Sequence, residues 1–129
     1  MSQVKPSDLE MQVLSVLWEQ GPSTAREVRE AMPDGKPRAY TTILSAMQVM
    51  EKKGLLKHTQ RGVAHVYRPA VNRQSILRPF VRKVVNEVFG GRPVAVMQAL
   101  LDDGRISDED LAEMRKLLND ARRTDETGT

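Results

Sequence analysis

The residues best suited to chemistry in this chain are cations gathered in its middle third. Residues 36–68 carry seven lysines and arginines against a single acid, Glu51. The seven are Lys36, Arg38, Lys52, Lys53, Lys57, Arg61 and Arg68. Ammonium and guanidinium groups bind phosphate, and DNA binds them strongly because each contact releases condensed counterions. The segment therefore predicts a surface that binds nucleic acid.

The positive charge is confined to this segment. The 129 residues carry a formal net charge of +3. Residues 1–35 hold three bases and six acids, residues 36–70 hold seven and one, and residues 71–129 hold ten of each. A focused positive field steers a protein toward polyanions. Charge alone does not distinguish such a site from an ordinary solvated basic face.

The residue types that most enzymes need are scarce. Cysteine is absent, which excludes disulfides, thiolate metal sites and thiol nucleophiles. His58 and His65 are the only histidines, so a metal site or a triad would need carboxylates almost throughout. We therefore expect no enzymatic activity, no metal and no cofactor.

The sequence has no apolar run near the roughly 18 residues of a membrane span and no signal-type core at its start, so we expect a cytoplasmic protein without membrane insertion.

Two helices are predicted before the basic segment, each by a capping box. The sequence Ser-Asp-Leu-Glu at residues 7–10 begins the first, which Gly21-Pro22 ends. The sequence Thr-Ala-Arg-Glu at residues 24–27 begins a shorter helix that ends before Pro33. A loop rich in proline and glycine follows.

A third helix is predicted over residues 39–53, with Gly54 as its left-handed cap. At about 100° per residue, one face is apolar and can pack on the first two helices. This face consists of Ile43, Ala46, Met47 and Met50. The opposite face consists of Thr41, Ser45, Gln48 and Lys52, with Arg38 and Thr42 at its margin. Hydroxyls, an amide and cations suit a major groove, whereas an ordinary exposed face would carry Glu–Lys pairs.

Two strands should follow, over residues 55–60 and 63–67, joined through Arg61-Gly62. A helix-turn-helix with a hairpin is the winged-helix arrangement, in which the wing lies along the duplex beside the recognition helix. The sequence therefore predicts a mainly α protein with a small β-hairpin. The residues expected to contact bases are Thr41, Thr42, Ser45 and Gln48. Those expected to hold phosphate are Arg38, Tyr40, Lys52, Lys57 and Arg61.

The remainder of the chain predicts amphipathic helices without special chemistry. Apolar residues recur at helical spacing between residues 72 and 121, and Pro79 should kink or restart the first of these helices. A twofold homodimer would bury the apolar stripes and present two DNA-binding heads to one duplex. The expected dimer contacts are Phe80, Val84, Val88, Leu100, Leu111, Met114, Leu117 and Leu118. The alternative is that these helices fold back on the first domain.

These observations predict three parts: a winged-helix DNA-binding domain over residues 1–70, a helical dimerisation domain over residues 71–121 and a flexible tail over residues 122–129. Two other functions stay open. A small-molecule-responsive winged-helix regulator would have a ligand pocket in the C-terminal helices, although seven methionines and few aromatic residues favour adaptable packing. A winged helix used only for protein contact would tolerate acids on the third helix.

The motifs resemble those of the penicillinase-repressor family, which includes methicillin-resistance repressors and copper-responsive repressors. The resemblance extends from residue 7 to about residue 118, and it is the order and spacing of the motifs that make it specific. The motifs are Leu17-Trp18, residues 24–28, 39–43 and 53–55, Arg61-Gly62, residues 67–69 and 89–91, Ile106-Ser107 and Leu117-Leu118.

The resemblance implies a dimeric winged-helix repressor that occupies a pseudo-palindromic TACA/TGTA-type operator as part of an antibiotic response. In relatives, a membrane-bound sensor metalloprotease responds to β-lactam, and the repressor is then cut in its dimerisation region. The chain departs from the family at three points. Ala99-Leu100 stands where some relatives have an Asn-Phe cleavage pair, Val49 stands where arginine is common, and the Cys-x-Cys motifs of copper-responsive members are missing.

Overall fold

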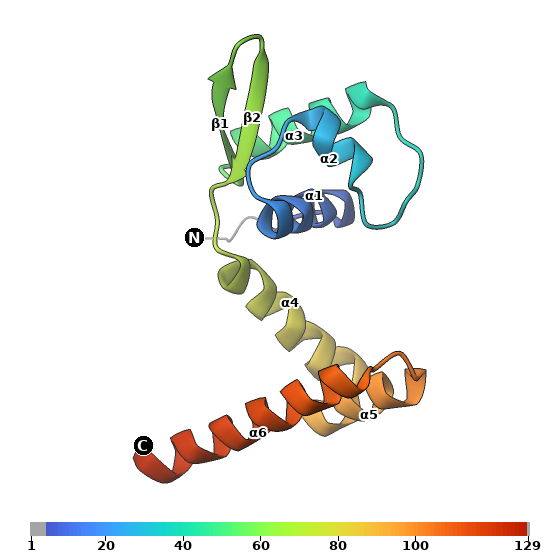
Figure 1. Ribbon diagram of the computed structural model, residues 1–129, viewed down its shortest axis with the longest axis vertical. Helices are drawn as coiled ribbons and strands as arrows, with labels where there is room; N and C mark the ends of the chain where they lie inside the picture. Colours follow the sequence, from blue (N-terminus) through green and yellow to red (C-terminus); the bar gives the residue numbers. More distant parts are fainter. Residues whose placement is uncertain (1–4, 129) are drawn as a thin grey trace. The chain divides into compact units, whose positions relative to one another are not determined.

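The computed structural model describes the backbone of residues 5–128, which divides into two compact units. The first unit continues to Phe80 and the second begins at Val81. Figure 1 shows the elements in chain order: α1 (Asp8–Gln20), α2 (Ala25–Glu30), α3 (Tyr40–Lys52), β1 (Leu56–Arg61), β2 (Ala64–Pro69), α4 (Arg73–Val88), α5 (Pro93–Asp103) and α6 (Asp108–Gly128). The fold is mainly helical, a winged helix-turn-helix followed by C-terminal helices, as the sequence predicted.

Both predicted capping boxes are present at the first two helices. The backbone N–H of Ser7 donates to Glu10 Oε1 at 3.0 Å, and the Glu10 N–H donates to Ser7 Oγ at 3.2 Å. Thr24 and Glu27 form the same reciprocal pair at 2.8 and 3.2 Å. Each box satisfies amides that a helix start leaves without an intrahelical partner. The two helices therefore begin where the local sequence directs.

Helix α3 buries the apolar face that its sequence predicted. Ile43, Met47 and Met50 are wholly buried, and Ala46 is partly buried. They join one core with residues of α1, α2 and the wing: Val13, Leu14, Leu17, Val28, Leu55, Leu56 and Tyr67. Burying a side chain of this size stabilises a fold by about 1.5–3 kcal/mol. The rotation of α3 about its own axis is fixed by this packing.

Gly54 turns the chain from α3 into the wing. Its φ of +84° is the left-handed conformation that glycine adopts without a Cβ penalty. The Leu55 N–H donates to the Met50 carbonyl at 2.9 Å, and the Gly54 N–H donates to that of Glu51 at 3.0 Å. This is the double hydrogen bond of a Schellman motif. It satisfies carbonyls at the end of α3 and leads directly into β1.

The hairpin loop lies one residue later than predicted. The register pairs Arg61 with Ala64, so the loop is Gly62-Val63 and the prediction of Arg61-Gly62 is wrong. Gly62 has a φ of +61°, and glycine at the first position of a two-residue loop is typical of a type II′ turn. Arg61 is therefore the last residue of β1, and Val63 stands at the tip, 99% exposed.

The first unit includes the start of α4, beyond the predicted boundary at residue 70. The indole N–H of Trp18 donates to the Val71 carbonyl at 3.2 Å, and Arg73 forms an ion pair with Glu19 at 2.9 Å. Ile76 packs against the core of the unit. These contacts attach the first turn of α4 to α1. The division of functions at residue 70 stays a prediction.

The second unit is built from helices with little buried surface. Helix α4 is continuous through Pro79 and does not restart near Arg78. None of the side chains described between residues 81 and 123 is buried. Helix α6 begins after a Ser107 cap and continues to Gly128, past its predicted end at residue 121. Residue 129 of the predicted tail lies outside the described residues, and the flexibility of residues 122–128 stays a prediction.

Glu10 links α1 to the end of α3. Its side chain is 7% exposed and accepts hydrogen bonds from Lys53 Nζ at 2.9 and 3.1 Å, besides the bond from Ser7. Burial alone would raise the pKa of Glu10, but the hydrogen bonds from Lys53 and Ser7 outweigh it and lower the pKa below its usual 4.5. The folded state therefore favours the ionised carboxylate.

We predict that Glu10→Gln lowers the free energy of unfolding at pH 7 by about 1–2 kcal/mol, since half-exposed Lys53 loses its charged partner. Because folding lowers the pKa of Glu10, this contribution is complete above pH 4.5 and is lost as the pH falls through the lower folded value. Urea unfolding from pH 7 to about pH 3 should show the stabilities of the two proteins converging. Glu19→Gln, at a largely exposed carboxylate, is the control and should stay near wild type. A constant difference at all pH values would contradict the prediction.

Candidate nucleic-acid interface

Helix α3 exposes the face predicted to contact bases, because its opposite side is held in the core. The exposed residues of this face are Thr41, Thr42, Ser45, Gln48 and Lys52. Tyr40, at the start of the helix, is 39% exposed, and the guanidinium carbon of Arg26 lies 5.7 Å from the centre of its ring. In the described structure no side chain caps the start of α3, where Ala39 occupies the N-cap position. Hydroxyl, amide and ammonium groups are thus displayed together along one helix.

The single acid of the basic segment is bound by the wing. His58 Nδ1 lies 2.8 and 2.7 Å from the two carboxylate oxygens of Glu51. The His58 ring stacks on His65 with ring centres 4.1 Å apart, and buried Tyr67 lies beside both. Glu51 is about 120° around the helix from Ser45. The carboxylate therefore joins α3 to β1 and lies at the edge of the face predicted to contact bases, about 60° around the helix from Gln48.

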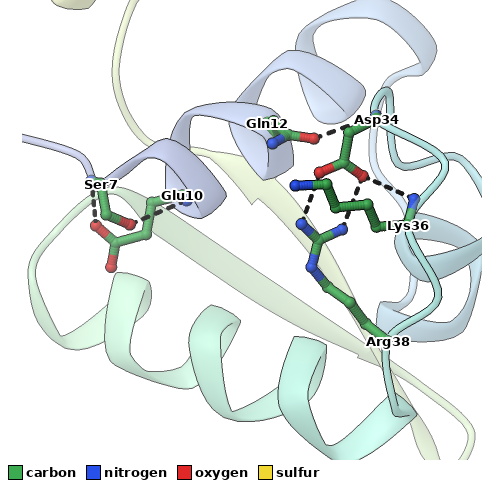
Figure 2. Close-up of polar contacts among 6 residues, drawn as sticks. All are labelled: Ser7, Glu10, Gln12, Asp34, Lys36 and Arg38. Atoms are coloured by element: carbon green, nitrogen blue, oxygen red, sulfur yellow. Dashed lines mark hydrogen bonds and ion pairs between the residues drawn. The ribbon is translucent and has the colours of Figure 1, made fainter.

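Arg38 has a partner that the sequence did not predict. Its Nη1 and Nη2 donate to Asp34 Oδ1 and Oδ2 at 2.9 and 2.7 Å, as Figure 2 shows. The hydrogen bonds from Arg38 and from the Lys36 N–H hold the pKa of Asp34 well below its usual value, and Asp34 raises the pKa of Arg38. Arg38 therefore has a structural contact of its own, besides its predicted role at phosphate.

The same Asp34 anchors the loop that leads into α3. Its backbone N–H donates to Gln12 Oε1 of α1 at 3.3 Å (Figure 2). From α2, Arg29 Nε donates to the Arg38 carbonyl at 2.6 Å. The loop is thus tied to both preceding helices despite its proline and glycine content. This fixes the backbone just before Tyr40, where α3 begins.

The hairpin gathers its cations on one face. Directly opposed residues of an antiparallel pair share a face, as do alternate residues of one strand. The register places Lys57 opposite Arg68, and Arg61 lies on the same side of β1 as Lys57. All three are exposed, and none forms an ion pair with another described residue. The wing therefore presents a row of positive charge.

The sequence did not predict two exposed residues of this surface, Arg68 and Val49. Arg68 is one of the seven cations of the basic segment, but only the observed register shows that it stands beside Lys57. Val49 is an exposed aliphatic residue of α3, which helical spacing alone could have placed near Ser45.

The positive charge of Arg61 also acts on an acid of α2. The pKa of Glu27 is lowered first by its hydrogen bonds from Thr24 and to a smaller extent by Arg61.

The predicted dimer contacts belong to other elements, α4, α5 and α6, and most of them are exposed. The exposed ones are Phe80, Val88, Leu100, Leu117 and Leu118. Val84, Leu111 and Met114 are partly buried. Val81, Val94 and Leu101 are also exposed, although they are not among the predicted dimer contacts. Helices α4, α5 and α6 thus each display apolar side chains.

Other kinds of site have little support in the described part of the chain. A shallow hollow of about 360 Å³ lies along α5, between Arg92 and Asp102, and is lined by that helix and its N-cap alone. No three His, Asp or Glu side chains among the described residues are grouped to hold a metal ion. In the described part of the chain, no helix is long and apolar enough to cross a bilayer.

Comparison with known proteins gives matches over most of the chain. The family model described as penicillinase repressor matches residues 6–120. Two curated relatives, each called "Transcriptional regulator BlaI", come from Mycobacterium tuberculosis strains CDC 1551 / Oshkosh and ATCC 25618 / H37Rv. Each is 35% identical over 71 residues, which is 54% of this chain and 51% of the relative. The chain thus spans about half the length of these relatives.

Among solved structures, the chain is similar to the solution structure of Bacillus licheniformis BlaI, a monomeric form in complex with the blaP half-operator. The identity is 26% and the TM-score is 0.48, over 57% of this chain and 89% of that chain.

We predict that Arg68→Glu stabilises the fold at low salt. Like charges directly opposite on a strand pair are destabilising, so a carboxylate facing Lys57 replaces repulsion with attraction worth about 0.5 kcal/mol. The gain should shrink in 1 M salt, which screens exposed charges. Urea unfolding at low and high salt measures it.

Lys57→Glu should give a similar gain, because it reverses the other charge of the pair. The double variant Lys57→Glu/Arg68→Glu should give none, because two acids then face each other. Equal gains in the single and double variants would show that the effect does not arise across the strands.

Proposed function

The chain belongs to the penicillinase repressor family, whose proteins are transcriptional repressors and not enzymes, and from this premise we propose that it represses transcription by binding one DNA sequence through α3 and the wing. The observation that carries the proposal is the outward face of α3. It combines exposed hydroxyl, amide and ammonium groups, and the acid at its edge, Glu51, is bound by His58.

In this proposal α3 enters the major groove. Thr41, Thr42, Ser45 and Gln48 contact base edges, since short hydroxyls approach them closely and a glutamine amide can bond adenine at two positions. A helix of this diameter fits the major groove of B-form DNA. The rigid core behind α3 supports the assignment, because a helix that is already fixed loses little entropy on binding.

Phosphate contacts come from the cations that have no ion-pair partner among the described residues. Lys52 extends from the end of α3, and the row formed by Lys57, Arg61 and Arg68 extends along the wing. Tyr40 contributes its hydroxyl. Arg38, which already holds Asp34, mainly orients the loop before α3 and reaches phosphate through its remaining N–H donors. Together these groups supply affinity that is independent of sequence.

We further propose that the protein acts as a homodimer on a pseudo-palindromic operator. The exposed apolar residues of α4, α5 and α6 support this, because apolar area left in water on several helices favours self-association. A twofold dimer presents two copies of α3 to half-sites about one helical turn apart or a multiple of it. Residues 71–121 then form the dimerisation domain and residues 1–70 the DNA-binding domain.

We predict different losses for helix and wing variants. Ser45→Ala and Gln48→Ala should each weaken binding to a self-complementary TACA/TGTA duplex by roughly tenfold, the value of a base contact of 1–3 kcal/mol, and should spare binding to a scrambled duplex. Arg61→Ala should weaken binding to both and reduce the slope of log affinity against log salt by about 0.9.

Fluorescence anisotropy at several salt concentrations measures these effects. The control is Lys83→Ala, which also removes an exposed cation but lies outside the set of residues proposed to contact DNA. Lys83→Ala should leave both affinities and the salt slope close to those of wild type. Helix variants that lose affinity equally for both duplexes would refute the assignment of base contacts.

We predict that Leu117→Asp disrupts the dimer. Leu117 is 68% exposed within one chain, so the change should leave the fold intact, but it places a charge in the proposed contact of both copies. Sedimentation equilibrium should show the dimer dissociation constant raised at least tenfold. Asn119→Asp adds the same charge about 200° away around α6 and should have little effect. A wild-type protein that stays monomeric at high micromolar concentration would contradict the dimer.

A further inference from the structure

Val49 stands out on the polar face of the recognition helix. It is 45% exposed, whereas Ile43, Met47 and Met50 of the same helix are wholly buried. It follows Ser45 by four residues and precedes Lys52 by three, so all three are neighbours on one flank of α3. An aliphatic side chain thus sits among hydroxyl and ammonium groups proposed to face DNA.

Neither packing nor helix stability explains a valine there. Val49 takes no part in the core of the first unit. A branched Cβ also makes valine a poorer helix former than alanine, lysine or glutamate at an exposed position. What the position offers is two methyl groups held rigidly, in one preferred rotamer, beside Ser45. Such a group suits an apolar contact on a partner that is otherwise polar.

Double-stranded DNA displays one apolar group of this kind. The C5-methyl of thymine projects into the major groove, whereas the other base edges there offer hydrogen-bond donors and acceptors. We propose that Val49 packs against a thymine methyl and so selects thymine at one position of each half-site. The neighbouring Ser45 hydroxyl then contacts an adjacent base or phosphate. The inference rests on the proposed function and adds a specificity-determining residue to it.

Replacing thymine by deoxyuridine tests the contact, because it removes the C5-methyl and changes nothing else in the base pair. The probe is the duplex that the full chain enriches from a random pool, with each thymine replaced in turn. At one thymine per half-site, wild type should lose about fourfold in affinity, from roughly 0.8 kcal/mol per buried methyl group. Val49→Ala should lose affinity for the thymine duplex and become indifferent to that replacement.

Two matched variants make the test specific to Val49. Val63→Ala removes an equally apolar side chain from the wing tip and should keep the wild-type response at that thymine. Thr42→Ser removes a methyl from a residue proposed to contact bases and tests whether that methyl, instead of Val49, makes the contact. Circular dichroism checks that Val49→Ala is folded, which its exposed position and the helix preference of alanine favour.

The possible outcomes distinguish a failure of the Val49 contact from a failure of the proposed function. If a sequence is enriched but no thymine responds, or if Val49→Ala responds like wild type, the Val49 assignment falls and the proposed function stands. If Thr42→Ser alone abolishes the response, the contact belongs to Thr42 and the assignment to Val49 is wrong. If no sequence is enriched, the proposed function fails and the inference fails with it.

Discussion

Burial of three residues on one side of α3 is the constraint on which the rest of this structure depends. Ile43, Met47 and Met50 lie at helical spacing and are wholly enclosed by α1, α2 and the wing. A rotation of the helix by a quarter turn would expose them and would bury hydroxyl or ammonium groups without partners, at a cost of several kcal/mol. What α3 offers to a ligand is therefore set by what it buries.

Five of the seven cations of the basic segment divide into two kinds on this framework. Lys53 forms an ion pair with Glu10, which joins α1 to the end of α3. Arg38 forms an ion pair with Asp34 in the loop that leads into α3. Lys57, Arg61 and Arg68 have none among the described residues and stand together on the wing, although mutual repulsion there weakens the hairpin. Repulsion of this kind is relieved by an anion, which supports assigning the second group to phosphate, whereas Lys53 is structural and Arg38 combines a structural contact with its proposed contact to phosphate.

The parts that the sequence predicts well are those determined by local spacing. Both capping boxes and the two faces of α3 follow from contacts three and four residues apart. The parts that it misses depend on the register of the hairpin and on the path of a loop. A shift of the hairpin loop by one residue changes which cations are opposed. The position of Arg68 opposite Lys57 therefore follows only from the observed register. The Asp34–Arg38 pair depends on the path of a proline- and glycine-rich loop, which short-range patterns do not specify.

The second unit gives the proposed dimer a physical basis. Its helices expose apolar side chains and bury almost none, so a single copy gains little free energy from packing them. Joining two copies would add that missing burial and would also link two α3 helices. The second head then binds at the high effective concentration set by the first, and the free energies of the two half-sites combine. One apolar surface would in this way govern both the stability of the C-terminal helices and the affinity for an operator.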